Sequence, residues 1–195
     1  MFTKQSFRFA ALVALAGVLV LPGLAAAQAP AKPKPAAKPA APPAPGGATP
    51  TLLGQYGDWG AYAASNGGRK VCYALAKPSS SQTSPPNRPR DAAFIFVSNR
   101  PAENVHNEVS IMIGYAFKPG SEASVEVGTN KFAMYTQKDG AWIKNAAEEV
   151  RMVDIMRKGA DLVVTGTSGR GTQSTDRYSL KGLSQALDRA AQDCK

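Results

Sequence analysis

Two residue types that often carry protein chemistry are scarce in this sequence. Its 195 residues contain one histidine, His106, and two cysteines, Cys72 and Cys194. A zinc or other transition-metal site uses several such ligands, and two cysteines that form a disulfide with each other cannot serve as thiolate ligands. We therefore expect no metal site and no cofactor.

The single histidine also limits the catalysis that the chain could perform. His106 lies near Glu103 and Glu108 and is expected to be a solvated surface residue. As a catalytic base it would need a nucleophile and an orienting partner from elsewhere in the fold, and the sequence has no nucleophile-elbow motif. The sequence therefore indicates a protein that is not an enzyme; a hydrolase that uses His106 is the alternative.

Concentrated charge is missing as well. The chain carries 23 basic and 14 acidic residues, a net charge of +9. Five of the basic residues precede Thr51, which leaves 18 bases against 14 acids, or +4, without a run of five like charges. A nucleic-acid interface needs a basic patch with aromatic residues on it, so no nucleic-acid partner is expected.

Long apolar runs are absent outside the N-terminus. There, Lys4 and Arg8 precede an apolar run from Phe9 to Leu24, and three alanines follow it before Gln28. This is the pattern of a secretory signal peptide, and the run is shorter than the roughly 20 residues that a spanning helix needs. We predict a signal peptide at residues 1–27 and no membrane span after its cleavage; an uncleaved anchor is the alternative.

The segment after the predicted signal differs in composition from the rest of the chain. Residues 28–50 are almost entirely Ala, Pro, Lys and Gly, which predicts a disordered linker because such a stretch buries too little apolar surface to fold. It could act as a spacer or as a solubilising tail. Residues 51–195 have the size of one domain with its own core.

Short β-branched and aromatic runs alternate with turn signals throughout residues 51–195, which predicts a mainly β fold of antiparallel strands. In one run, Val109, Ile111, Ile113 and Tyr115 share a face, and the Lys138-Asp139-Gly140 turn is the strongest hairpin signal. The expected strands are residues 57–64, 70–76, 92–99, 107–115, 124–127, 132–137, 141–144, 161–167 and 172–179.

Two segments predict helices. Asn145 can cap the first, with Glu148 completing a capping box, and Gly159 can provide a left-handed stop. The second begins near Ser179. Its apolar face follows helical spacing and consists of Leu180, Leu183, Leu187, Ala190 and Cys194.

The two cysteines predict a single disulfide, because export implies an oxidising compartment. Cys72 alternates with Ala74 and Ala76, whose small side chains leave room for a helix on that face of the strand. We predict that the last helix packs across this strand and that the Cys72–Cys194 bond holds its final turn. Two unlinked cysteines are the alternative.

Three residues are candidates for contact with a partner. Residues 77–91 form a long polar connection that carries Arg88 and Arg90, and long loops on β folds often carry binding sites. A disordered insert is nevertheless the favoured interpretation of this stretch. If it does bind a partner, deletion of residues 79–90 is expected to spare folding while weakening the interaction. Trp59 is a candidate surface anchor, although core packing is the favoured interpretation of this residue.

The glycine-rich stretch Gly166–Thr172 is similar to a phosphate-binding loop in composition only. It lacks the Gly-Lys-Ser/Thr ending of that motif and joins two predicted strands rather than a strand and a helix. The sequence therefore predicts a β-turn here.

Several motifs occur in a specific order between residues 56 and 194. They are YGDWG (56–60), FIFVSNRP (94–101), NEVSIMIGYAFKPGS (107–121), AWIKNAAE (141–148), VTGTSGRGTQSTDRYSLKGLSQAL (164–187) and the terminal Cys194. In order and spacing they resemble the invasion-associated locus B (IalB) family of exported bacterial proteins, found mainly in α-proteobacteria. The resemblance implies an immunoglobulin-like β-sandwich, a periplasmic or surface location and, in pathogenic relatives, an association with host-cell entry; it supplies no catalytic residues.

These observations lead to one main functional hypothesis. The chain is expected to be a non-enzymatic envelope protein, located in the periplasm, at the outer membrane or outside the cell. It would bind an envelope protein, a glycan or an outer-membrane component. The alternative is a peptidoglycan-associated envelope-maintenance module in which residues 28–50 contact the cell wall.

Overall fold

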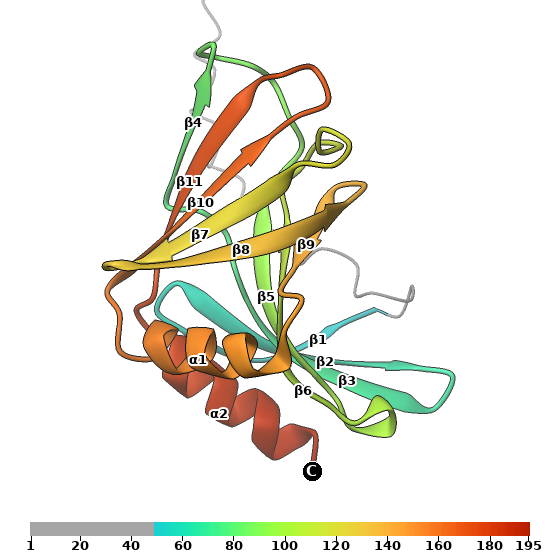
Figure 1. Ribbon diagram of the computed structural model, residues 1–195. Helices are drawn as coiled ribbons and strands as arrows, with labels where there is room; N and C mark the ends of the chain where they lie inside the picture. The colour runs from blue at the N-terminus through green and yellow to red at the C-terminus, as the bar shows by residue number, and fades with distance from the viewer. Residues whose placement is uncertain (1–48) are drawn as a thin grey trace, which may run out of the picture. The chain divides into compact units, whose positions relative to one another are not determined.

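Figure 1 shows the computed structural model of the protein, which describes residues 49–195. The predicted signal peptide, and the predicted linker apart from its last two residues, lie outside the described residues. The elements in chain order are β1 (Thr51–Tyr56), β2 (Trp59–Asn66), β3 (Arg69–Ala76), β4 (Ser80–Ser84), β5 (Phe94–Arg100), the 3-10 turn η1 (Pro101–Glu103), β6 (Val105–Met112), β7 (Glu122–Val127), β8 (Asn130–Gln137), β9 (Gly140–Trp142), α1 (Ala146–Met156), β10 (Asp161–Thr167), β11 (Gln173–Ser179) and α2 (Leu183–Asp193). Neither α-helix of these residues is long and apolar enough to cross a membrane.

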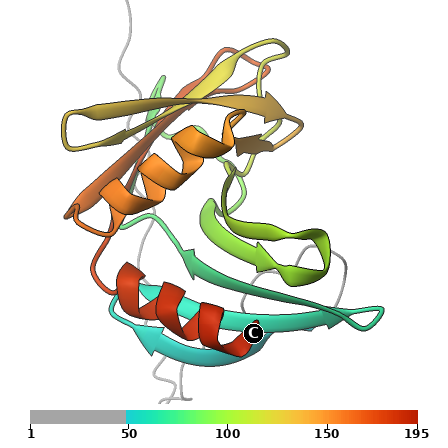
Figure 2. The ribbon, with the colours of Figure 1, turned by 60° about the horizontal axis from the view of Figure 1, so that its bottom comes forward.

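All the strands belong to one antiparallel sheet, in the order β1-β2-β3-β5-β6-β9-β8-β7-β10-β11-β4. The sheet curls, so that β2 and β11 meet where Trp59 Nε1 donates a hydrogen bond to Ser179 O at 2.9 Å. The prediction of a mainly β fold with two helices is confirmed. The immunoglobulin-like sandwich implied by the resemblance is not confirmed, because a sandwich has two sheets without hydrogen bonds between them. Here β5 and β6 pair with each other and with strands on either side, so that the two curved layers form one continuous sheet (Figure 2).

Two strands were not predicted from the sequence. β1 contains an irregularity between Leu52 and Gly54 that interrupts its alternation. β4 consists only of Ser, Gln and Thr and is largely exposed, and it pairs with β11 from Ser80 to Ser84. Its extended conformation is therefore fixed by hydrogen bonds to β11 rather than by burial of an apolar face.

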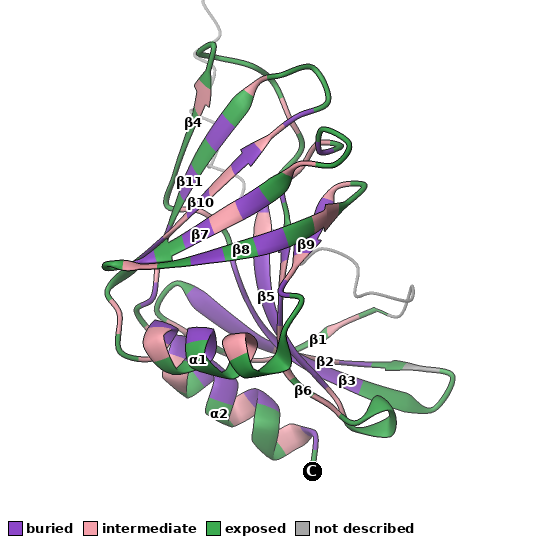
Figure 3. Cartoon of the chain, viewed as in Figure 1, coloured by how far each residue is buried: buried purple, intermediate pink, exposed green. Residues whose placement is uncertain are grey.

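One hydrophobic core fills the inside of the curled sheet. Buried positions alternate with more exposed ones along β7, β8, β10 and β11, whereas β3 and β5 are buried on both faces (Figure 3). Val109, Ile111 and Ile113 are completely buried, as their alternation predicts. Trp59 and Phe132 are among the largest buried side chains. Burial of each such side chain stabilises the fold by about 1.5–3 kcal/mol.

Helix α1 has the predicted cap at Asn145, but no hydrogen bond from Asn145 N to the Glu148 side chain completes a capping box within residues 49–195, and the helix ends differently. Asn145 Oδ1 accepts hydrogen bonds from the amides of Ala147 and Glu148, at 2.9 and 3.4 Å. Gly159 does not adopt the predicted left-handed conformation. A Cβ at Gly159 would lie 2.7 Å from a methyl group of Val127 and 2.8 Å from one of Leu180, so close packing, not a helix stop, requires glycine here.

Helix α2 begins at Leu183 rather than near Ser179. The residues before it form a turn against the start of the sheet, where Asp58 N donates to Lys181 O at 3.2 Å. Gly182 has a φ of +94°, and a Cβ there would collide with Tyr56 O. Contact with the β1–β2 turn thus overrides helix formation before Leu183.

The disulfide between Cys72 and Cys194 is present, with a Cα–Cα distance of 5.8 Å. Both sulfur-bearing residues are buried and pack with Ala190 of α2. The prediction that the last helix lies across the Cys72 strand is confirmed, because α2 packs against β2 and β3. On the opposite face of β3, Tyr73 joins a second apolar cluster with Phe96 of β5.

A carboxylate on α1 completes the hydrogen bonding of β6. β9 pairs only with Ser110, Ile111 and Met112 of β6, and Glu149 Oε1 accepts the hydrogen bond from Val109 N at 2.8 Å. Burial raises the pKa of Glu149 above its ordinary 4.5, although the bond from Val109 opposes the shift. The folded protein therefore binds this proton more tightly than the unfolded chain does.

We expect the free energy of unfolding to fall as pH rises above about 4.5, through the range in which Glu149 ionises. Glu149→Gln keeps an acceptor for Val109 but cannot ionise, so it should reduce this pH dependence and be at least as stable as the wild type at about pH 7. Urea unfolding at a series of pH values measures both effects. Glu149→Ala removes the acceptor and should be less stable than Glu149→Gln by about 1–2 kcal/mol. Equal pH dependence in the wild type and Glu149→Gln would contradict the assignment.

Candidate partner-binding groove

The chain between β4 and β5 is a fixed segment rather than a loose insert. Arg88 N donates to Thr83 Oγ1 at 3.1 Å, and Asp91 N donates to Gly114 O at 3.0 Å. Together with β4, these bonds contradict the disordered-insert interpretation of residues 77–91. The segment is instead held against β4 at one end and against the chain that follows β6 at the other.

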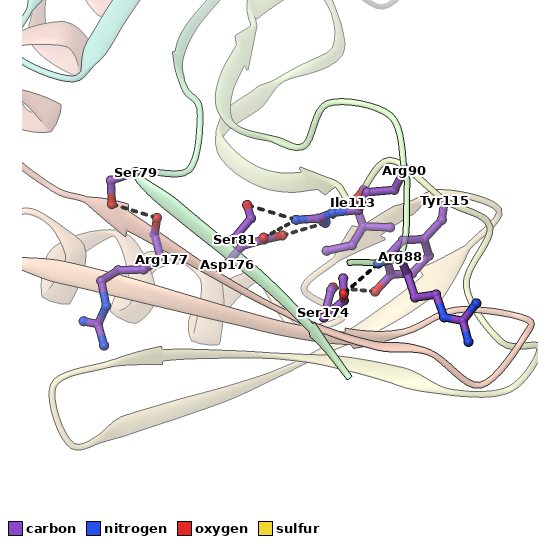
Figure 4. Close-up of polar contacts among 10 residues, drawn as sticks. Ser79, Ser81, Arg88, Arg90, Ile113, Tyr115, Ser174, Asp176 and Arg177 are labelled. Atoms are coloured by element: carbon purple, nitrogen blue, oxygen red, sulfur yellow. Dashed lines mark hydrogen bonds and ion pairs between the residues drawn. The ribbon is translucent and has the colours of Figure 1, made fainter. Parts of the chain in front are cut away.

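Arg90 forms the strongest of these attachments. Its guanidinium group donates to both carboxylate oxygens of Asp176 in β11, to Ser81 Oγ at 3.1 Å and to Ile113 O at 2.8 Å (Figure 4). The side chain of Asp176 is fully buried and that of Arg90 is 10% exposed. Such a two-pronged, charge-assisted pair fixes both position and orientation.

The electrostatic environment keeps Arg90 charged. Burial alone would lower the pKa of its guanidinium group, but the hydrogen bond and negative charge of Asp176 raise the pKa above its ordinary value. The charges of the two side chains compensate each other. Arg90 is therefore a structural link between the segment and β11, and it is not available to neutralise an external anion.

An aromatic side chain lies against this ion pair. Tyr115 Oη and Ser174 Oγ are 2.7 Å apart and form a hydrogen bond, and the Arg90 guanidinium lies 6.0 Å from the centre of the Tyr115 ring (Figure 4). Burial raises the pKa of the Tyr115 hydroxyl. The phenol therefore stays neutral and contributes to the wall of the site rather than to its charge.

The predicted turn in Gly166–Thr172 connects β10 to β11. Ser168 N donates to Thr172 O and Gly171 N donates to Ser168 O, both at 2.8 Å, while Gly169 N donates to Ala116 O at 2.9 Å. These amides are bonded within the protein and do not form a cradle for phosphate. The turn interpretation is confirmed, and the turn places the side chain of Arg170 at the surface.

These segments enclose an open groove of about 910 Å³. The β4–β5 segment contributes Arg88, the chain after β6 contributes Tyr115, and the β10–β11 turn contributes Arg170. Asp91 is the one acidic residue among the described residues that line it. In Figure 4 the Arg88 guanidinium points away from the Arg90–Asp176 pair.

The structure brings together only two of the candidate residues. Arg88 and Arg90 line the groove, whereas Trp59 is completely buried in the core, the interpretation favoured for it. His106 is exposed on β6, eight residues before Gly114, which places it about 25 Å from the groove along the strand. Its ring forms no hydrogen bond with any residue between 49 and 195.

Three residues of this region were missed by the sequence analysis. Tyr115 was predicted only as the last residue on the apolar face of the 107–115 strand, but β6 ends at Met112, and Arg170 had no distinguishing pattern. Asp176 had one, because it occupies an inward position of β11 between Ser174 and Tyr178, which are both buried. A carboxylate on the core side of a strand requires a buried cation or several donors, and that requirement points to Arg90.

The described residues contain no group of three or more His, Cys, Asp or Glu side chains that could hold a metal ion. The groove offers guanidinium, hydroxyl and backbone groups and the carboxylate of Asp91.

Fold and groove together define a disulfide-closed β module with an open groove lined by the β4–β5 segment and the β10–β11 turn. The sequence model described as "Invasion associated locus B (IalB) protein" matches residues 59–191. This is more than half of the chain, which therefore belongs to the IalB family. Neither this family nor the solved structure described next is known as an enzyme.

Among solved structures, the chain is similar to invasion associated protein B from Bartonella henselae. The TM-score is 0.50 at 17% sequence identity, and the match covers 71% of this chain and 94% of the other. At this identity the likeness concerns the fold. No curated protein matches the chain significantly.

Proposed function

We propose that this chain is a non-enzymatic cell-envelope protein that binds a macromolecular partner through the groove. The proposal rests on two exposed arginines without ion-pair partners in residues 49–195, which lie beside a segment that an ion pair holds in place. Arg90 is locked to Asp176, whereas the exposed Arg88 and Arg170 form no ion pair with any residue between 49 and 195. A pre-ordered segment loses little entropy when it binds, which favours affinity.

The proposed location, the periplasm or the outer membrane, is supported by three features. The disulfide is of the kind that persists in oxidising compartments. The first 27 residues have the pattern of an export signal. The family name associates relatives with invasion, and the same binding activity would serve host contact in an invasive species.

A binding role is favoured over catalysis by the composition of the groove. The described lining residues include no histidine, cysteine or glutamate, and the Arg90 and Tyr115 side chains are held by internal bonds. General acid–base catalysis needs a titratable pair that converges on a substrate. The peptidoglycan-associated alternative depends on residues 28–50 and stays a prediction.

Retention on native envelope fragments tests the proposal. The double variant Arg88→Glu/Arg170→Glu places negative charge in the groove, and we expect retention of the full-length protein to fall at least about tenfold. The matched control Arg69→Glu/Lys158→Glu makes the same change of net charge at exposed residues far from the groove, and it should bind like the wild type. Equal losses in both variants, or none in either, would remove the groove from the proposal.

A further inference from the structure

The charge on the groove is incompletely compensated. Asp176 neutralises Arg90, and Asp91 is the one carboxylate among the described lining residues, against the two exposed guanidinium groups of Arg88 and Arg170. These come from separate segments, the β4–β5 connection and the β10–β11 turn. Guanidinium groups bind carboxylate and phosphate oxygens through paired hydrogen bonds. The groove is therefore suited to a ligand that carries anionic groups.

The lining also lacks the anchors that other kinds of ligand use. The large hydrophobic side chains exposed among the described residues are Leu52, Met112, Tyr135 and Val150, and none of them lines the groove. Protein partners usually bury an aromatic or aliphatic anchor in such a site, and binding to a lipid surface requires apolar side chains to insert. The apolar residues that do line it are Pro85, Pro89 and Ala116, which are too short to insert into a lipid surface. The groove thus disfavours a membrane as its ligand, and a peptide is compared directly in the test below.

Hydroxyl and glycine positions make up much of the remaining lining. Thr83, Ser168 and Thr172 contribute hydroxyl groups, and Gly169 and Gly171 leave the backbone uncovered. Thr83 Oγ1 and Ser168 Oγ already accept hydrogen bonds from the amides of Arg88 and Thr172, so these two hydroxyls can still donate to a ligand. The hydroxyl of Tyr115 is bonded to Ser174 and its ring faces Arg90, so it is not a free stacking surface of the kind single-stranded nucleic acids require. A hydroxyl-rich ligand matches these groups best.

The groove is open to solvent rather than enclosed, whereas sites for small molecules enclose most of their ligand. A volume of about 910 Å³ in an open groove leaves room for a chain to enter and leave. A polymer can therefore place successive charged units against Arg88 and Arg170.

We propose that the groove binds an acidic polysaccharide, one whose sugars carry carboxylate or phosphate groups. The anionic groups bond to Arg88 and Arg170, and the sugar hydroxyls bond to the Ser and Thr side chains of the lining. This assignment rests on the proposed envelope-binding function and names the class of its partner.

The test is direct binding of the full-length, disulfide-bonded protein to defined polymers by calorimetry at low salt. Polygalacturonate supplies carboxylates and a phosphorylated mannan supplies phosphates, with dextran as the neutral polysaccharide. Polyglutamate and phosphatidylglycerol vesicles offer the same charge on a peptide and on a membrane. We expect binding to at least one acidic polysaccharide, none to dextran, and weaker binding as salt rises.

The variants then locate the binding. Arg88→Ala and Arg170→Ala should each weaken polysaccharide binding about tenfold, while Arg69→Ala and Lys158→Ala should leave it unchanged; circular dichroism verifies that all four are folded. Preference for polyglutamate or vesicles, equal loss in all four variants, or no binding to either acidic polysaccharide would overturn the assignment. If groove variants still reduce retention on native envelopes in that case, only the partner class is wrong and the proposed function stands.

Discussion

Replacing Arg90 by alanine is expected to destabilise the protein by about 3–5 kcal/mol, the cost of leaving a buried charge without its partner. Asp176 is fully buried, and the substitution also removes donors to Ser81 and Ile113. Guanidinium chloride unfolding measures the loss. Arg88→Ala, at an exposed neighbour, should change stability by no more than about 0.5 kcal/mol.

A double substitution separates the ion pair from the packing around it. Arg90→Met with Asp176→Leu removes both charges and should be clearly more stable than Arg90→Ala alone, because no unpaired charge remains. If Arg90→Ala proved as stable as the wild type, the ion pair would not hold the β4–β5 segment. The result also bears on deletion of residues 79–90, which would remove β4 together with Arg90 and should destabilise the fold rather than spare it.

Removing the disulfide is the second change with a large expected effect. Cys72 and Cys194 are 122 residues apart in sequence, and in the chain-entropy account a loop of this size stabilises the folded state by about 4–5 kcal/mol. We expect Cys72→Ala/Cys194→Ala to unfold about 10–20 °C below the wild type. Alanine avoids placing an unpaired hydroxyl in the buried cluster with Ala190.

Two controls accompany this measurement. A reductant should lower the melting temperature of the wild type towards that of the double variant and leave the variant itself unchanged. Hydrogen exchange should rise first in α2, the element that the bond holds to β3. A loss below about 1 kcal/mol would show that packing of α2 alone secures the end of the chain.

Local patterns explain which parts of the fold could be predicted. The alternation of Val109, Ile111 and Ile113 and the cap at Asn145 depend on neighbours within a few residues, and the structure has both. The disulfide followed from compartment and cysteine count. In the first two cases short-range sequence information was sufficient, whereas the disulfide joins residues 122 apart and could be predicted because only one pairing is possible.

The remaining features depend on contacts between distant parts of the chain. β4 has no apolar residue and is extended because β11 pairs with it. The partner of Arg90 lies 86 residues away in sequence, and Gly159 is required by side chains of Val127 and Leu180. Single-sequence patterns cannot identify such partners, although Asp176 at an inward strand position signals that one exists.

Site-specific photo-crosslinking in the source cell tests most directly whether the groove is the binding surface. A diazirine side chain, which reacts with sugars as well as peptides, replaces Pro89 in the groove lining, and a second variant carries it at the exposed Gln185 of α2. We expect a discrete envelope adduct from position 89 that is absent from position 185 and that is lost when Arg88→Glu and Arg170→Glu are added. The same adducts from both positions, or none from position 89, would contradict the account.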